Sequence, residues 1–190
     1  MPGFRIALCL IALAAGHAYA ATTQTGGRPA GHAASSAFPW PDFDDFLRQL
    51  TARAGLPLRI YKLKMGANGV DLWIQNPRQP DFVDSYEYDE GDMKGPIPIK
   101  FEKYPTLEAI DGHVIPREQV DFARLPTLAD LACVAANLPD ANVIGIKLER
   151  SESRGKTKRW MPIWEFSLRS GDKYATVTYD LEGNLLHVDK

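Results

Sequence analysis

The first strong hydrophobic pattern along the chain is helical and covers residues 42–54. Apolar residues recur there at intervals of three and four, while charged residues occupy the other side. Asp42 stands where an N-cap is expected, and Gly55 and Pro57 follow the last turn. We therefore predict an amphipathic helix over residues 42–54. Its predicted apolar face comprises Phe43, Phe46, Leu47, Leu50 and Ala54.

Strand patterns follow this helix, with apolar residues in alternation and turn residues between the segments. Asn68-Gly69 predicts a tight hairpin between the first two strands. Pro96 and Pro98 restrict the last strand to an edge of the sheet, because proline donates no backbone hydrogen bond. The predicted strands are 58–65, 70–75, 82–88 and a short one at 97–101.

The same order of elements begins again after a proline-broken connector at 103–125. Thr127 is placed to cap a second helix at 128–138. The predicted apolar face of this helix comprises Leu128, Leu131, Ala132, Ala135 and Leu138. The predicted strands that follow it are 142–150, 160–169, 174–181 and a short one at 185–188.

A Trp and a Tyr-Asp pair recur in the two halves with the same separation. Trp73 precedes Tyr88-Asp89, and Trp164 precedes Tyr179-Asp180; a glycine-containing turn follows each pair. Repetition of this kind indicates duplication of one structural unit. Trp164 shares the apolar face of its strand, whereas Trp73 alternates against its apolar neighbours. Either the register of the two strands differs by one residue, or the Trp match is accidental.

These residues resemble the PepSY-type domain, present here in two copies. The resemblance depends on Trp164-Glu165-Phe166 with Tyr179-Asp180-Leu181-Glu182-Gly183-Asn184-Leu185, and on Trp73 with Tyr88-Asp89-Glu90-Gly91. The tandem form also resembles the two-module beta-lactamase inhibitor proteins. The resemblance implies an exported, non-catalytic module of the kind found in peptidase propeptides and inhibitors, and it makes Asp180 and Gly183 structural turn residues.

The predicted fold class is therefore α+β. It consists of two similar modules, 38–102 and 126–190, and each is a helix packed on a small antiparallel sheet of about four strands. The connector 103–125 joins the two modules.

The segment that precedes the first helix has the pattern of a targeting sequence. Arg5 is followed by an apolar run at 6–15 and by Ala18-Tyr19-Ala20, a small-x-small cleavage signal. We predict a signal peptide at 1–20, cleavage near Ala20-Ala21 and a flexible tether at 21–37. The apolar run is too short to span a bilayer comfortably, so no membrane span is expected.

Composition narrows the class of partner and the compartment. Without residues 1–20 the chain keeps 21 of its 22 Lys and Arg residues against 24 Asp and Glu residues, a net charge of −3. A slightly acidic chain favours neither nucleic acid nor an anionic membrane. Only Cys133 remains after processing, so no internal disulfide can form. These features favour a periplasmic or secreted protein.

A basic loop is the first candidate binding site. Arg150, Arg154, Lys156, Lys158 and Arg159 lie in the first hairpin of the second half, where the first half has only a short turn. Lengthening one loop of a repeated scaffold is a common way to add function. We interpret the loop either as a solvated connection or as a grip on an acidic partner surface.

Acidic residues form a second candidate site around the third strand of the first half. Asp84, Glu87 and Asp89 lie there, together with Asp81, Glu90 and Asp92. Three interpretations are open: a solvated strand face, a contact surface for a basic partner, and calcium binding. The spacing is not that of an EF-hand, so no metal or other cofactor is predicted.

Chemistry of other kinds has little support in the sequence. His113 and His187 have no second ligand at metal-binding spacing, and no nucleophile, zinc or phosphate-loop motif is present. Cys133 projects away from the predicted apolar helix face, so it is either an inert flanking residue or a thiol that pairs between chains. Trp160, Trp164 and Phe166 are interpreted as the sheet face under the helix, with a ligand groove as the alternative.

We therefore expect a protein without enzymatic activity that binds a protein partner in the periplasm, such as a hydrolase or a toxin, and inhibits or regulates it. The alternative is a binder of a small ligand or an envelope component that uses a groove between the modules. The sequence leaves the oligomeric state open.

Overall fold

The computed structural model of the protein describes residues 37–99, 110–152 and 159–190. The predicted signal peptide, nearly all of the tether, the first part of the connector and the loop residues Arg154, Lys156 and Lys158 lie outside these residues.

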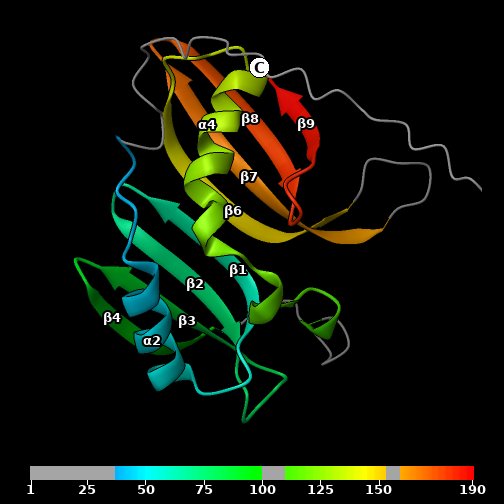
Figure 1. Ribbon diagram of the computed structural model, residues 1–190. Helices are drawn as coiled ribbons and strands as arrows, with labels where there is room; N and C mark the ends of the chain where they lie inside the picture. The colour runs from blue at the N-terminus through cyan, green and yellow to red at the C-terminus, as the bar shows by residue number, and fades with distance from the viewer. Residues whose placement is uncertain (1–36, 100–109, 153–158) are drawn as a thin grey trace, which may run out of the picture. The chain divides into compact units, whose positions relative to one another are not determined.

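The order of elements in Figure 1 follows the predicted order closely. The first half contains α2 (Phe43–Ala54), β1 (Arg59–Gly66), β2 (Gly69–Gln75), β3 (Val83–Asp89) and β4 (Asp92–Ile99). The connector contains β5 (Ile115–Pro116) and two 3-10 turns, Arg117–Gln119 and Phe122–Arg124. The second half contains α4 (Leu125–Ala135), β6 (Asn142–Glu152), β7 (Trp160–Ser170), β8 (Lys173–Asp180) and β9 (Leu185–Asp189).

The ends of α2 are set by the residues that the sequence indicated. The Asp42 side chain accepts hydrogen bonds from the backbone N–H groups of Asp44 and Asp45, two groups that have no partner within the helix. Gly55 ends the helix with φ at 80°, a conformation that favours glycine. Phe46 and Leu50 on the apolar face are fully buried. The prediction for this helix is confirmed.

The nine strands of the described residues belong to one antiparallel sheet. The strand order is β4-β3-β2-β1-β6-β7-β8-β9, and β5 pairs with the start of β1. The predicted α+β class is confirmed, but the prediction of separate four-stranded sheets is wrong. The halves join where β1 pairs with β6, with Leu63 opposite Leu148. This pairing satisfies two strand edges that separate sheets would leave open.

Two turn and edge predictions hold in this sheet. Gly69 begins β2 with φ at 101°, and a Cβ atom there would lie 2.3 Å from the carbonyl oxygen of Tyr88, so the tight turn requires glycine. The strand with Pro96 and Pro98 is β4, and it lies at one edge of the sheet. It begins directly after β3 and is longer than predicted.

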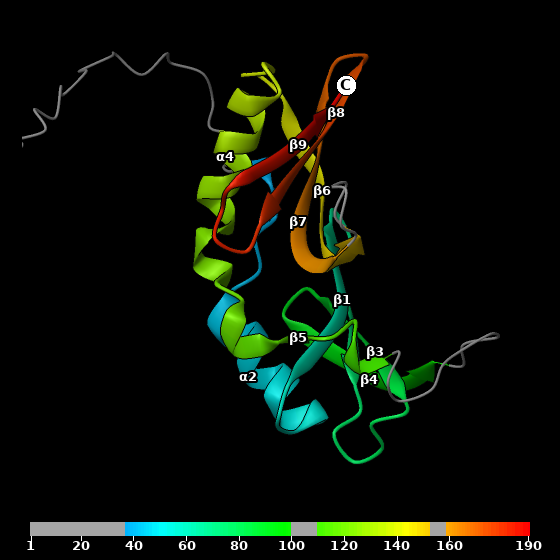
Figure 2. The same ribbon diagram turned by 90° about the vertical axis from the view of Figure 1, so that its right-hand side faces the viewer.

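Both helices lie on the same side of the sheet (Figure 2), and the main hydrophobic core lies between them and the strands. Trp164 and Phe166 are buried there, as predicted. Phe122 of the connector joins the two halves, because its ring lies 5.5 Å from the ring of Phe43 and 6.1 Å from that of Trp164. The core is therefore continuous across both halves. Trp160, in contrast, is 52% exposed.

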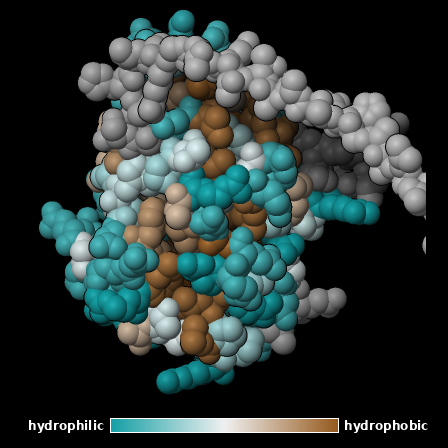
Figure 3. All heavy atoms as spheres, viewed as in Figure 1, coloured by the Kyte–Doolittle hydropathy of each residue, from teal (hydrophilic) through white to brown (hydrophobic). Residues whose placement is uncertain are grey.

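Helix α4 presents a different face to the sheet from the predicted one. It begins at Leu125, with proline in its first turn, and packs small residues such as Ala129 and Ala132 against the strands. Leu131 is 48% exposed and Val134 is 71% exposed on the outer side. Figure 3 shows hydrophobic surface on the helix side of the molecule. Small side chains let the helix approach a sheet face that already carries Trp164 and Phe166, so size rather than hydropathy decided its orientation.

Cys133 belongs to the buried face of α4. Its side chain is only 3% exposed, and its thiol donates to the carbonyl oxygen of Ala141 over 3.6 Å. Burial raises the pKa of the thiol to about 11, and the charge of Asp130 adds to the shift. The prediction that Cys133 projects away from the packed face is wrong, because the helix is rotated from its expected orientation.

Candidate functional site

The face of the sheet away from the helices carries a ladder of charged side chains. On this face Lys62 lies opposite Glu149, and Lys147 lies opposite Glu165. The Lys62 Nζ atom lies 2.9 Å from Glu149, and the Lys147 Nζ atom lies 3.0 Å from Glu149 and 2.9 Å from Glu165. Three neighbouring strands, β1, β6 and β7, supply every member of this ladder. We call this side of the sheet the open face.

The ladder is held in its charged form by its own contacts. Burial alone raises the pKa of Glu149, but hydrogen bonds from Lys62 and Lys147 outweigh burial and lower the pKa below its ordinary value. Burial alone lowers the pKa of Lys147, but hydrogen bonds to Glu165 and Glu149 raise it above its ordinary value. Both groups therefore stay ionised at neutral pH. The side chains of the ladder are about a quarter exposed, which leaves them within reach of a partner.

An aromatic side chain and a hollow extend the open face on the first half. The Lys64 ammonium lies 5.6 Å from the centre of the Trp73 ring. Next to them, at the β1–β2 turn, is a hollow of about 390 Å³. Lys64, Asp71 and Glu87 contribute its charged lining. Trp73 itself is partly buried against a small cluster of Val83, Ile110 and Val114.

The three predicted acidic residues do not form one surface. Asp84 is 4% exposed and accepts a hydrogen bond from the Asn76 side chain over 2.8 Å. Burial raises the pKa of Asp84, and the hydrogen bond from Asn76 offsets part of that rise. Asp84 is therefore not part of a solvated strand face, and its binding role stays a prediction. Asp84 lies on the helix side together with Tyr86 and Tyr88, because residues two apart in a strand share a face. This spacing in the sequence could have shown that Asp84 is buried.

Glu87 and Asp89 alternate on the open face of β3. The Glu87 carboxylate lies 3.2 Å from the Lys94 ammonium of β4, and both side chains are about half exposed. Asp89 lies opposite Asp92 at the β3–β4 turn. These two acidic residues are thus accessible to a partner, and Glu87 also lines the hollow beside Lys64.

The basic loop is described only at its two ends. The Arg150 side chain donates to the carbonyl oxygens of Val114 and Trp160, over 3.2 and 3.3 Å. It therefore fastens the β6–β7 hairpin to the connector, and this contact gives it a structural role. Arg159 is exposed. The other three predicted loop residues, Arg154, Lys156 and Lys158, lie outside the described residues.

The histidines lie in different surroundings. The ring of His113 is 4.4 Å from the exposed ring of Trp160 and 6.3 Å from that of Tyr61. His187, on β9, lies opposite Thr178 of β8. Among the described residues, no group of three or more His, Cys, Asp or Glu side chains has the geometry of a metal site.

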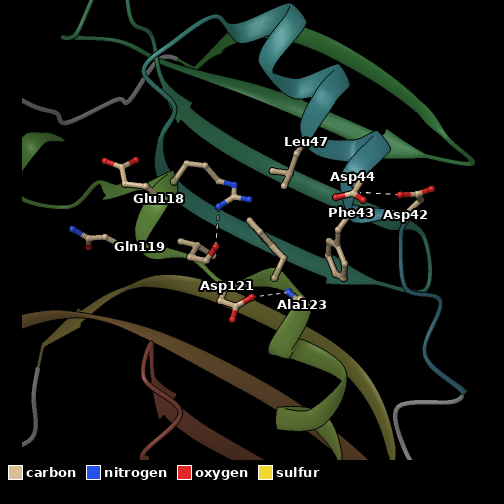
Figure 4. A pocket seen from close by; sticks show the side chains of 11 residues that line it. Asp42, Phe43, Asp44, Leu47, Glu118, Gln119, Asp121 and Ala123 are labelled. Carbon is tan, nitrogen blue, oxygen red and sulfur yellow. Dashed lines mark hydrogen bonds between the residues drawn. The ribbon is translucent and has the colours of Figure 1, made fainter.

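A second hollow, of about 540 Å³, lies between the start of α2 and the connector (Figure 4). Asp42, Asp44, Glu118 and Asp121 bring acidic groups to it, and Phe43 and Leu47 line its apolar part. The Asp42 and Asp121 carboxylates accept backbone hydrogen bonds at the turns they cap. The Arg117 guanidinium lies over the Phe122 ring and donates to the carbonyl oxygen of Val120. These polar groups stabilise the connector.

The charged ladder is the feature that residue motifs missed. Lys62, Lys147, Glu149 and Glu165 stand at the polar positions of alternating strands, so each could be assigned to the outer face from the sequence. Their juxtaposition depends on the pairing of β1 with β6. That pairing joins segments more than 80 residues apart, and no local pattern predicts it.

Comparison with known proteins shows the fold of this chain. No family model matches the sequence, and no curated protein matches it. Among solved structures, it resembles the "putative lipoprotein" of Clostridium difficile 630, with a TM-score of 0.52 and 12% sequence identity. The similarity covers 80% of this chain and 93% of that one. Within the described residues, the helices are too short or too polar to cross a membrane.

Proposed function

We propose that the chain is an exported, non-catalytic binding protein that recognises a protein partner through its open face, and that it inhibits or regulates that partner. A hydrolase or a toxin of the periplasm is the partner class we favour. The observation that carries the proposal is the open face itself. A sheet covered by helices on one side presents charged, hydrogen-bonding and aromatic side chains on the other.

The composition of the open face suits a protein surface better than a small ligand. Its lysines and carboxylates alternate, so it offers paired donors and acceptors without a strong field of one sign. Trp73, with the Lys64 ammonium near its ring, is an aromatic side chain of the kind that anchors interfaces. Mixed charge of this kind contributes more to specificity than to affinity.

We also propose that the two halves derive from duplication of a PepSY-like unit. Each half runs from a helix into four successively paired strands, and the two sets meet at β1 and β6. The similarity to the lipoprotein structure supports the fold, and the sequence at 1–20 supports export.

The alternative, a small-ligand groove lined by tryptophan, has less support. Trp164 is 1% exposed and packed in the core. Neither of the two hollows, of about 390 and 540 Å³, has tryptophan in its lining.

The experiment that tests the proposal is capture of a partner by the processed chain, 21–190, from a periplasmic extract of its own source. The bait is compared with a variant whose open face carries Lys64→Glu and Asp71→Lys. These residues lie opposite each other on β1 and β2, so the exchange keeps their cross-strand attraction while it inverts the pattern that a partner meets. We expect one partner to bind the unaltered chain and to lose at least tenfold in affinity for the variant.

A matched control places a charge on the other side of the sheet. Val134→Glu on the outer surface of α4 should leave capture unchanged, since this residue is 71% exposed and faces away from the strands. A third bait with Arg159, Arg154, Lys156 and Lys158 all changed to Ser tests the basic loop, with Arg150 kept for its structural contacts. Equal capture by the unaltered chain and the open-face variant contradicts the proposed surface. A small molecule that co-purifies in place of a protein supports the alternative.

A further inference from the structure

The two edges of the sheet differ in how they are protected against pairing with another strand. Strand β4 forms one edge and β9 the other (Figure 1). On β4, Pro96 and Pro98 remove backbone donors, the register shifts between Ser85 and Glu87 of its neighbour, and Lys94 adds a charge. These are the devices by which proteins prevent edge-to-edge association. They are concentrated on one edge of this sheet.

Strand β9 has few of these devices. It runs from Leu185 to Asp189 without a proline, and its pairing with β8 is regular from His187 onward. Leu185 is 52% exposed and Leu186 is 43% exposed. The register of β9 with β8 shifts once, at Leu186, and the segment from His187 to Asp189 is regular. An edge strand with a regular segment and exposed apolar side chains is a template for a further strand. The charge pattern of β9 indicates which strand it fits.

The side chains of β9 are divided between the two faces of the sheet. His187 lies opposite Thr178, and Asp189 lies opposite Thr176, so both are on the open face. Val188 lies opposite buried Val177 on the helix side. A strand that pairs with β9 must keep polar residues on the open face and apolar residues on the helix side, because a one-residue slip exchanges the faces.

We propose that β9 pairs antiparallel with β9 of a second copy of this chain, with the two-fold axis at Val188. His187 of each copy then lies opposite Asp189 of the other, which gives two equivalent pairs on the open face in which an imidazole N–H can donate to a carboxylate. Val188 lies opposite Val188 on the helix side, and Leu186 lies beside the aliphatic stem of Lys190. The strand is thus complementary to itself.

Neighbouring registers are less complementary. An axis at His187 would place His187 against itself and Asp189 against Leu185. An axis between two residues would put side chains of the helix side opposite those of the open face, and a two-fold axis normal to the sheet forbids this arrangement. Of these registers, only the one at Val188 both keeps the faces matched and places His187 opposite Asp189.

The dimer would be weak, because a five-residue strand buries less surface than a standard interface. We expect a dissociation constant on the order of 10⁻⁵ M. Pairing of the two β9 strands would join two open faces into one continuous surface. This inference goes beyond the proposed function, and it can hold or fail whether or not a partner is found.

Sedimentation equilibrium of chain 21–190, from about 5 μM to 1 mM, tests the dimer at concentrations on both sides of the expected constant. His187→Glu places like charges opposite each other twice and should weaken association about tenfold. The double variant His187→Glu with Asp189→Lys places opposite charges at both positions and should recover the dimer. Both side chains lie at the surface, and thermal unfolding of each variant verifies that the monomer stays folded.

A control at the other edge separates strand pairing from general stickiness. Leu186→Lys should weaken the dimer about tenfold, because it faces Lys190 of the second copy. Ile97→Lys on β4, at a residue that is 64% exposed, should leave association unchanged. A monomer throughout the concentration range overturns the proposal. A dimer that ignores the charge exchange, or that responds equally to Ile97→Lys, also overturns it.

Discussion

The two halves of the sheet share one order of elements but fill their parts of the core with different residues. Helix α2 packs large side chains, Phe46 and Leu50, against its strands. Helix α4 buries two leucines near its start, Leu125 and Leu128, and then the smaller side chains of Ala129, Ala132 and Cys133. The strands of both halves bury large aromatic side chains, Tyr86 and Tyr88 in the first half and Trp164 and Phe166 in the second. The two halves thus share an order of elements, while the later turns of α4 fill the core with smaller side chains than α2 does.

The two tryptophans show the same difference. Trp164 lies opposite Leu148 and Tyr179 on the helix side. Trp73 lies opposite Lys62 and Ser85 on the open face. They therefore occupy opposite faces of the sheet, although their spacing from the Tyr-Asp pairs is the same. Tyr88 and Tyr179, in contrast, are both buried on the helix side, so the two Tyr-Asp pairs are placed alike.

The largest expected effect separates these tryptophans by stability. Trp164→Ala should lower the free energy of unfolding by about 3–5 kcal/mol, because it leaves a cavity in the main core. Trp73→Ala should cost about 1–2 kcal/mol, because the ring is only partly buried on the open face. Urea unfolding followed by circular dichroism measures both. Similar losses for the two variants would contradict the division between a core tryptophan and a surface one.

The second prediction is that burial of Cys133 on α4 makes the stability of the chain fall at alkaline pH. Because the pKa of Cys133 is raised to about 11, the folded chain keeps its thiol proton at pH values where the unfolded chain has lost it. The stabilising contribution is therefore complete below about pH 9 and is lost as the pH rises toward 11, at up to about 1.4 kcal/mol per pH unit. Cys133→Ala should remove this part of the alkaline destabilisation.

The measurement is the difference in unfolding free energy between the unaltered chain and Cys133→Ala from pH 7 to pH 10.5. Tyrosines away from Cys133 titrate in both proteins and cancel in the difference. Tyr179 does not cancel fully, because burial and the charge of Cys133 together raise its pKa. Alkylation of the native chain at pH 8.5 gives an independent check, since a thiol that is 3% exposed should react only after unfolding. Parallel stability curves, or rapid alkylation of folded protein, would place Cys133 outside the core.

The smallest expected effect compares two ion-pair sites on the open face. Lys147→Met removes the shared partner of Glu149 and Glu165 and should cost about 1 kcal/mol, because two partly buried carboxylates lose their compensation. Lys94→Met breaks an exposed pair with Glu87 and should change stability too little to detect.

The contribution of the ladder to stability should also depend on pH, through the carboxylate of Glu149. The pKa of Glu149 is lowered in the folded chain, so its contribution is present above its unfolded value and is lost as the pH falls through the folded value. The cost of Lys147→Met should therefore shrink below about pH 4. Denaturant midpoints at pH 7 and pH 3.5 test this, and a cost that is the same at both pH values would count against the ladder.

Much of the local structure was predictable because it depends on neighbours in the chain. Asp42 and Gly55 fix the ends of α2 through backbone groups within a few residues of them. Alternation placed Val70, Leu72 and Ile74 on one face of β2, where all three are buried. The same rule, applied to Asp84, would have placed it on the helix side. Predictions failed where two distant surfaces had to fit, as for the rotation of α4 and the burial of Cys133.

The sequence by itself determined the order of helices and strands, the turn at Gly69 and the edge position of β4. Each of these follows from backbone conformations and hydrogen-bonding capacity that a few adjacent residues control. Only the tertiary structure decided that both halves share one sheet, that Arg150 fastens a hairpin, and that Lys62 and Lys147 meet Glu149. The pairing of β1 with β6 brings together residues far apart in the chain, and its free energy depends on the complementarity of whole surfaces.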